Sequence, residues 1–96
     1  PMTVLTPLKP ADVATRLKDR TAVLVDIREP DEFAREHVPG AIHAPLSRFE
    51  QAQTTLPDGR QIIYTCRTGN RTGMNCVKLA ASVPGEAFVL EGGLDA

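Results

Sequence analysis

The chain has 96 residues, of which 42% are hydrophobic and 24% charged, with 11 basic and 12 acidic side chains and a formal net charge of -1. This length fits one folded domain with one hydrophobic core, and the near-neutral charge disfavours a nucleic-acid partner. No apolar run approaches the roughly 20 residues that a membrane-spanning helix needs, so we expect no membrane contact within this chain.

Both ends of the chain look cut. Pro1-Met2 has the character of a cloning remnant, and the sequence stops at Ala96, just after Gly92-Gly93, where a helix could begin. We therefore expect a single domain over residues 3–96, truncated before its final helix, in a parent protein that continues. Two cysteines are too few for a disulfide framework, which favours a reducing compartment such as the cytoplasm.

The first half of the chain alternates extended and helical segments. The predicted elements are an extended segment over 3–6, a helix over 10–18, a strand over 21–27, a helix starting within 29–34 and a short strand over 41–44. Pro10 suits a first helical turn, where its missing N–H has no partner anyway. The nearly continuous apolar run over 21–27 is typical of a central parallel strand that is covered on both faces.

The second half continues the alternation. Its predicted elements are a loop with one helical turn over 45–53, a turn over 57–60, a strand over 61–65, a helix from Thr72 to Pro84-Gly85 and a strand over 86–90. Strands that alternate with helices indicate a parallel sheet covered on both sides. We therefore predict an α/β fold, an open sheet of about five mostly parallel strands flanked by helices.

A cysteine-containing turn follows the strand over 61–65 directly and reads Thr65-Cys66-Arg67-Thr68-Gly69-Asn70-Arg71-Thr72. In an open parallel sheet, sites lie at the carboxyl ends of strands, where loops lead into helix N-termini. Successive N–H groups of such a loop can surround an anion, and Gly69 relieves the steric limit on the turn. Arg67 and Arg71 add positive charge, so the pattern predicts a reactive thiolate at Cys66.

This loop resembles the active loop of the rhodanese family, which often reads C-x-x-G-x-R-S/T. Asp26-Ile27-Arg28, with Phe33 and the stretch from His37 to Ile42, is similar to the family's D-x-R and H-I/V-P-G-A signatures, and Leu90-Glu91-Gly92-Gly93 is similar to its terminal G-G element. The resemblance implies a sulfurtransferase in which Cys66 takes a sulfane sulfur from thiosulfate or another persulfide donor and passes it to a thiol or cyanide. A protein persulfide partner is an alternative donor, and no metal or cofactor is implied.

Each candidate residue has an expected role. Cys66 is the nucleophile, and the loop residues that form its anion cradle and substrate site are Arg67, Thr68, Gly69, Asn70, Arg71 and Thr72. Arg67 is expected to point outward and attract an anionic donor, whereas Arg71 either binds the anion or makes a structural ion pair. The hydroxyl of Thr72 is a candidate helix cap.

Four further residues are expected to be structural. Asp26 and Arg28 are expected to pair and support the loops beside the site. Cys76 is expected to pack in the core like a small hydrophobic residue. His37 belongs to a corner of the fold rather than to a catalytic pair, and His43 has no assigned role.

Two rival functions fit parts of this pattern. A cysteine phosphatase is disfavoured because only four residues separate Cys66 from Arg71, whereas phosphatases of the related kind have five. A persulfide carrier without turnover, or a domain whose thiolate senses oxidants or nitric oxide, stays open because a low-pKa thiolate serves each of these roles. Some bacterial rhodanese-like proteins also carry membrane helices, so the cytosolic domain of a membrane-anchored parent is an alternative to a free cytoplasmic protein.

Overall fold

The computed structural model describes residues 4–95; residues 1–3, which include the expected remnant, and Ala96 lie outside the described residues. The strands are β1 (Thr6–Leu8), β2 (Ala22–Asp26), β3 (Ile42–His43), β4 (Gln61–Thr65) and β5 (Phe88–Leu90). The helices are α1 (Pro10–Lys18), α2 (Pro30–Arg35), α3 (Phe49–Ala52), α4 (Asn70–Met74) and α5 (Cys76–Ala81), with short 3-10 turns η1 (Leu46–Arg48), η2 (Gln53–Thr55) and η3 (Gly93–Asp95). The five strands form one parallel sheet in the order β1-β5-β4-β2-β3, which confirms the predicted α/β class.

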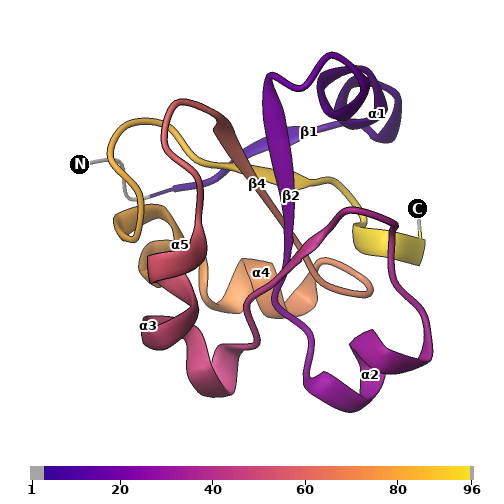
Figure 1. Ribbon diagram of the computed structural model, residues 1–96, viewed down its shortest axis with the longest axis vertical. Coiled ribbons are helices and arrows are strands. Elements are labelled where there is room, and N and C mark those ends of the chain that lie inside the picture. The colour runs from indigo at the N-terminus through magenta and orange to yellow at the C-terminus, as the bar shows by residue number, and fades with distance from the viewer. Residues whose placement is uncertain (1–3, 96) are drawn as a thin grey trace.

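Helices cover both faces of this sheet. In Figure 1, α1 lies to the right of the sheet, whereas α3 and α5 lie to its left. Successive residues of β4 pack on opposite faces of the sheet. Tyr64 belongs to the apolar cluster that contains Phe49 and Leu79, whereas Ile63 belongs to the cluster that contains Val13. A parallel strand buried on both faces accounts for the unbroken apolar run in the sequence.

The segment over 21–27 contains the predicted central parallel strand: β2 lies inside the sheet between β4 and the short β3, and β4 is the middle strand. The first strand begins at Thr6 and includes Pro7, so only the end of the extended segment predicted over 3–6 belongs to β1, and Thr3 lies outside the described residues. Thr6 donates its N–H to Ala87 and Leu8 accepts from Glu91, so Pro7 faces the outer edge of the sheet, where no strand requires an N–H.

The helix after the cysteine loop also differs from its prediction. It begins at Asn70 rather than Thr72 and is interrupted at Asn75, whose backbone angles (φ -112°, ψ 17°) separate α4 from α5. The side chain of Asn75 donates to the Arg71 carbonyl at 2.8 Å, which stabilises the interruption. Gly69, not Thr72, occupies the N-cap position, so the proposed capping role of Thr72 is wrong. Within residues 4–95, no helix is long and apolar enough to cross a membrane.

Candidate active site

Cys66 directly follows β4, at the carboxyl end of the middle strand. The residue is only 1% exposed, its Sγ accepts the Gly69 N–H at 3.2 Å, and the Thr72 hydroxyl lies 3.7 Å from it. Burial by itself raises the pKa of the Cys66 thiol, but the N–H and hydroxyl of Thr72 and the N–H groups of Gly69 and Arg71 outweigh it, so the net pKa is lowered. The loop therefore stabilises the thiolate with its own N–H and O–H donors.

The loop owes this shape to Gly69. Its φ of +97° lies in the left-handed region, and this turn brings its N–H to face the sulfur. The Thr72 hydroxyl lies 3.0 Å from the Gly69 carbonyl, so its single hydrogen has two acceptors within reach, this oxygen and the Cys66 sulfur. Thr68 and Asn70 are exposed, and the Asn70 N–H is directed to the Thr68 hydroxyl at 3.4 Å, so these two residues shape the outer rim of the loop.

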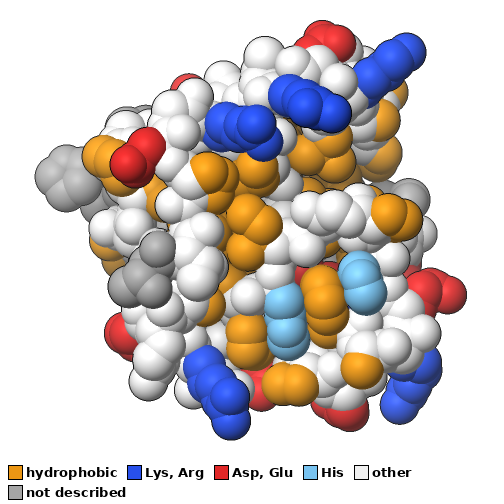
Figure 2. Space-filling view, viewed as in Figure 1, with side chains coloured by type: hydrophobic (Ala, Val, Ile, Leu, Met, Phe, Trp, Pro, Cys, Tyr) orange, Lys and Arg blue, Asp and Glu red, His pale blue; other side chains and the backbone are white. Residues whose placement is uncertain are grey.

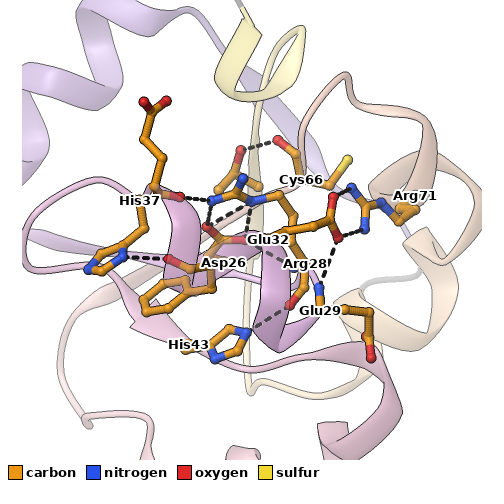
Figure 3. Close-up of polar contacts among 11 residues, drawn as sticks. Asp26, Arg28, Glu29, Glu32, His37, His43, Cys66 and Arg71 are labelled. Atoms are coloured by element: carbon orange, nitrogen blue, oxygen red, sulfur yellow. Dashed lines mark hydrogen bonds and ion pairs between the residues drawn. The ribbon is translucent and has the colours of Figure 1, made fainter.

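Arg71 points toward Glu32 on α2 (Figure 3). Its Nη1 and Nη2 donate to the two carboxylate oxygens of Glu32 at 2.6 and 2.9 Å. These hydrogen bonds hold the pKa of Glu32 at about 2, well below its usual value. Of the two roles left open for Arg71, the geometry favours the structural ion pair, and it connects α2 to the cysteine loop. Sequence reasoning missed Glu32, because nothing local marks it as the partner of a residue so far along the chain.

Asp26 and Arg28 form a buried pair at the end of β2 (Figure 3). The Arg28 Nε and Nη2 donate to Asp26 Oδ1 and Oδ2 at 3.0 and 2.9 Å, and Nη2 also donates to the Glu36 carbonyl at 2.8 Å. The hydrogen bond to Asp26 is the main reason that the pKa of Arg28 is raised. The pair braces the chain just after α2 and makes no direct contact with the sulfur.

The second glycine of the G-G element has a geometric role that the sequence did not reveal. Leu94 and Asp95 donate their N–H groups to the carbonyls of Cys66 and Arg67, both at 2.9 Å. Gly93, at φ +68°, lies so close that a Cβ there would be 2.5 Å from the Arg67 oxygen and 2.7 Å from the Cys66 oxygen. Only glycine permits this approach, so η3 anchors the backbone of the cysteine loop.

Arg67 points out of the loop, as expected. Its side chain is 65% exposed, and its Nε lies 3.7 Å from Asp95 Oδ2. Beside it is a cavity of about 510 Å³, which we call the Arg67 cavity. The residues that line the Arg67 cavity are Arg28, Glu32, Arg35, Glu36, His37, Val38, Pro39, Arg67, Leu94 and Asp95.

The two histidines form a stack with Phe33 rather than a catalytic pair. The Phe33 ring lies between His37 and His43, with centroid distances of 3.9 and 4.1 Å and nearly parallel planes. Figure 2 shows the two pale blue imidazoles on either side of an orange side chain. His37 Nδ1 donates to the Phe33 carbonyl and His43 Nε2 to the Arg28 carbonyl, so both rings hold the corner after α2 together.

Cys76 departs from its prediction. It is half-buried and lines a second, mostly apolar cavity of about 330 Å³ instead of packing in the core. Leu79 and Ala80 of the same helix, α5, are the residues that are buried in the core. Among residues 4–95, no group of three or more histidine, cysteine and acidic side chains is arranged to hold a metal ion.

A match to the family described as Rhodanese-like domain covers residues 9–96. The chain belongs to the rhodanese family. It is 33% identical over 83 residues to a sulfurtransferase of Allochromatium vinosum, which covers 85% of this chain and 78% of that protein. It is also 40% identical over 81 residues to the uncharacterized protein slr1261 of Synechocystis sp., with 82% of this chain covered. The match spans only 45% of slr1261.

The rhodanese fold is equally clear from solved structures. The crystal structure of a Pseudomonas aeruginosa thiosulfate sulfurtransferase superposes with a TM-score of 0.83 at 22% identity, over 99% of this chain and 18% of that one. The three rhodanese motifs of this chain follow β2, β4 and β5, whose carboxyl ends lie at one edge of the parallel sheet. The site is therefore assembled where open α/β sheets place their functional loops.

Proposed function

We propose that this rhodanese domain is a sulfurtransferase and that Cys66 carries the transferred sulfur as a persulfide. The observation that supports this most is the Cys66 Sγ itself, whose pKa is lowered inside a loop of N–H donors. The name of the A. vinosum relative, a sulfurtransferase, and the activity named for the P. aeruginosa structure point in the same direction.

The reaction follows from the loop. The Cys66 thiolate attacks the outer sulfur of thiosulfate, the S–S bond of the donor breaks, and sulfite leaves with the electron pair. The acceptor then attacks the outer sulfur of the persulfide, and Sγ leaves as a thiolate. Both covalent states of Cys66 are anionic at the loop, so the donors that lower the thiol pKa also stabilise the persulfide.

The donor is proposed to be an anion such as thiosulfate. The exposed guanidinium of Arg67 lies beside the loop and attracts anions from solution. A protein persulfide is the alternative donor, since it would respond to the same positive charge. Cys66 and Cys76 are both unpaired, which favours a reducing compartment, so we place the domain in the cytoplasm, either free or as part of a membrane-anchored parent.

Two alternatives make different predictions. A phosphatase would need an arginine aimed at its oxyanion, whereas Arg71 is engaged by Glu32 and the loop has only four residues between Cys66 and Arg71. A carrier or an oxidant or nitric-oxide sensor would keep the same thiolate without steady turnover. Steady-state kinetics separate a carrier or a sensor from an enzyme, because only the enzyme turns over repeatedly.

The test is the intact mass of the protein after incubation with thiosulfate, followed by cyanide. The native chain is expected to gain one sulfur atom, which cyanide removes as thiocyanate in repeated turnovers. Cys66→Ser is expected to gain none, whereas Cys76→Ser, the matched control, keeps the gain. A native chain that gains no sulfur from thiosulfate or mercaptopyruvate contradicts the proposal, and a single transfer without turnover favours the carrier.

A further inference from the structure

The exposed large hydrophobic side chains of residues 4–95 gather beside one cavity. They are Val4, Met74 and Val77, with exposed fractions of 57%, 85% and 61%. Val4 lines the mostly apolar cavity of about 330 Å³, and Met74 and Val77 directly follow two other lining residues, Gly73 and Cys76. We call the three exposed side chains together with this cavity the Met74 surface. Exposed apolar side chains that gather beside an apolar cavity are typical of a protein–protein contact.

An ion pair at the edge of the Met74 surface narrows the choice of partner. Among the described residues that line the cavity, Glu91 is the only charged one, and its Oε2 lies 3.8 Å from Lys9 Nζ. The side chains of Glu91 and Lys9 are 56% and 79% exposed, so their contact contributes little to stability and both charges are available to another molecule. A strongly acidic or strongly basic partner would place like charge against one of them. A second copy of this chain carries the matching apolar side chains and one charge of each sign.

The sheet edge beside this surface disfavours the other common way of joining two copies. β1 is an edge strand, and Pro7 in its middle has no N–H to offer at the outer edge. A sheet that continued across β1 of two chains would therefore lack a hydrogen bond at its centre. A contact between two copies at this edge has to use side chains rather than strand pairing.

We propose that the Met74 surface binds a second copy of this chain in a two-fold symmetric dimer. In a two-fold contact the same pair of residues meets twice, so Lys9 of each chain lies opposite Glu91 of the other. Met74, the most exposed of the three apolar side chains, is flexible, and in each chain it enters the cavity of the other. The inference does not depend on the proposed sulfur transfer.

The dimer contact reaches the back of the cysteine loop. Gly69 and Thr72 line the cavity, and the Gly69 N–H and the Thr72 hydroxyl also lie 3.2 and 3.7 Å from the Cys66 sulfur. Cys66 itself does not line the cavity, whereas the half-buried Cys76 does. The second copy therefore covers the Cys76 thiol, and in Cys66→Ser, which leaves Cys76 as the one thiol, alkylation is expected to slow as the protein concentration rises.

The ion pair provides a test by charge exchange. Sedimentation equilibrium from micromolar to millimolar protein is expected to show the native mass rising from the 10.4 kDa of one chain toward twice that value. Lys9→Glu and Glu91→Lys each place like charges opposite one another at two points of the contact, and each is expected to raise the Kd of the dimer about tenfold or more. The double variant Lys9→Glu/Glu91→Lys restores opposite charges and is expected to restore the native Kd.

The apolar part of the contact is tested separately. Met74→Lys places a charge where an apolar side chain enters the cavity, and it is expected to raise the Kd about tenfold or more. Ala34→Lys, an exposed position on α2 outside the Met74 surface, is the matched control and is expected to leave the Kd unchanged. Both positions are exposed, so Tm at micromolar concentration, where the native chain is monomeric, is expected to stay native.

The outcomes decide the proposal. A native chain that stays monomeric at millimolar concentration overturns it and leaves the Met74 surface to a different protein. A dimer that Met74→Lys does not weaken, or that Ala34→Lys weakens equally, has its contact elsewhere and also overturns it. A double charge variant that dimerises no better than the single variants refutes the pairing of Lys9 with Glu91. Alkylation of Cys76 at one rate across all concentrations would contradict the covering of its thiol by a second copy.

Discussion

Replacement of Gly93 by alanine is expected to destabilise the fold and to disturb the cysteine loop at the same time. The added Cβ would lie 2.5 Å from the Arg67 oxygen and 2.7 Å from the Cys66 oxygen, inside the 3.0 Å that real Cβ contacts respect. Both obstacles are backbone atoms, so no side-chain rotation relieves the overlap. The two peptide units on either side of Arg67, which carry the Cys66 and Arg67 carbonyls, have to move away from η3.

The expected loss has two parts. An alanine held at the Gly93 φ of +68° costs about 1–2 kcal/mol. Movement of the peptide weakens the two hydrogen bonds from Leu94 and Asp95, each worth about 1 kcal/mol. Together we expect a loss of about 3 kcal/mol in the free energy of unfolding, which in a domain of this size lowers Tm by about 12 °C or more.

The matched control is Gly85→Ala. Gly85 has a φ of +80°, but an added Cβ would meet nothing within 4 Å, so this variant carries the conformational cost alone. Thermal and urea unfolding compare the two variants, and the pH dependence of iodoacetamide alkylation reports the pKa of the Cys66 thiol. We expect a larger loss of stability and a raised thiol pKa only for Gly93→Ala. Equal stability losses in the two variants would refute the close-approach argument.

Three further predictions address the ion pairs and the thiolate. Glu32→Gln is expected to lower the free energy of unfolding by about 2 kcal/mol at pH 7. The pKa of Glu32 in the folded protein is about 2, against an ordinary 4.5, so its contribution to stability is fully present above about pH 4.5 and is lost as the pH falls toward 2. Urea unfolding of the variant should lack that pH dependence. Thr72→Val is expected to raise the pKa of the Cys66 thiol and slow its alkylation at neutral pH, whereas Thr72→Ser keeps the hydroxyl and the native rate. Equal alkylation rates in the two variants would show that the hydroxyl does not stabilise the thiolate. Asp26→Ala leaves a buried arginine unpaired and is expected to cost about 3–5 kcal/mol in urea unfolding, with the exposed Asp12→Ala near zero as the control.

Elements with strong local signals were predicted closely. The helix over 10–18 and the strand over 61–65 have the predicted bounds, because Pro10 marks a first helical turn and the apolar run after Arg60 ends at a turn. The position of Cys66 at a strand end followed from the same local logic. The interruption of the last helix at Asn75 depends on the backbone angles of a single residue, and no sequence pattern predicted it.

The candidate site was predictable only where its residues are neighbours in the sequence. Gly69 was expected to relieve the turn, and its φ of +97° agrees. The partner of Arg71 could not be chosen from the sequence, because Glu32 is one of two acids in α2, with Glu29 and Glu36 flanking the helix, and only tertiary packing selects it. The role of Gly93 likewise depends on how closely η3 approaches the loop, which residue spacing does not encode.

The strand order has a consequence for the folding kinetics. β1 pairs with β5, so Thr6 lies opposite Phe88 and the pairing must close almost the whole chain into a loop, whereas β2 and β4 are much closer in the sequence. Contacts between distant segments form slowly because their loop-closure entropy is lost before the contact gains anything. The β2–β4 pair is then the natural nucleus, and substitutions in β1 act mainly on the unfolding rate. Since η3 follows β5 and donates to the Cys66 carbonyl, we expect the cysteine loop to gain this backbone anchor only after β5 has joined the sheet.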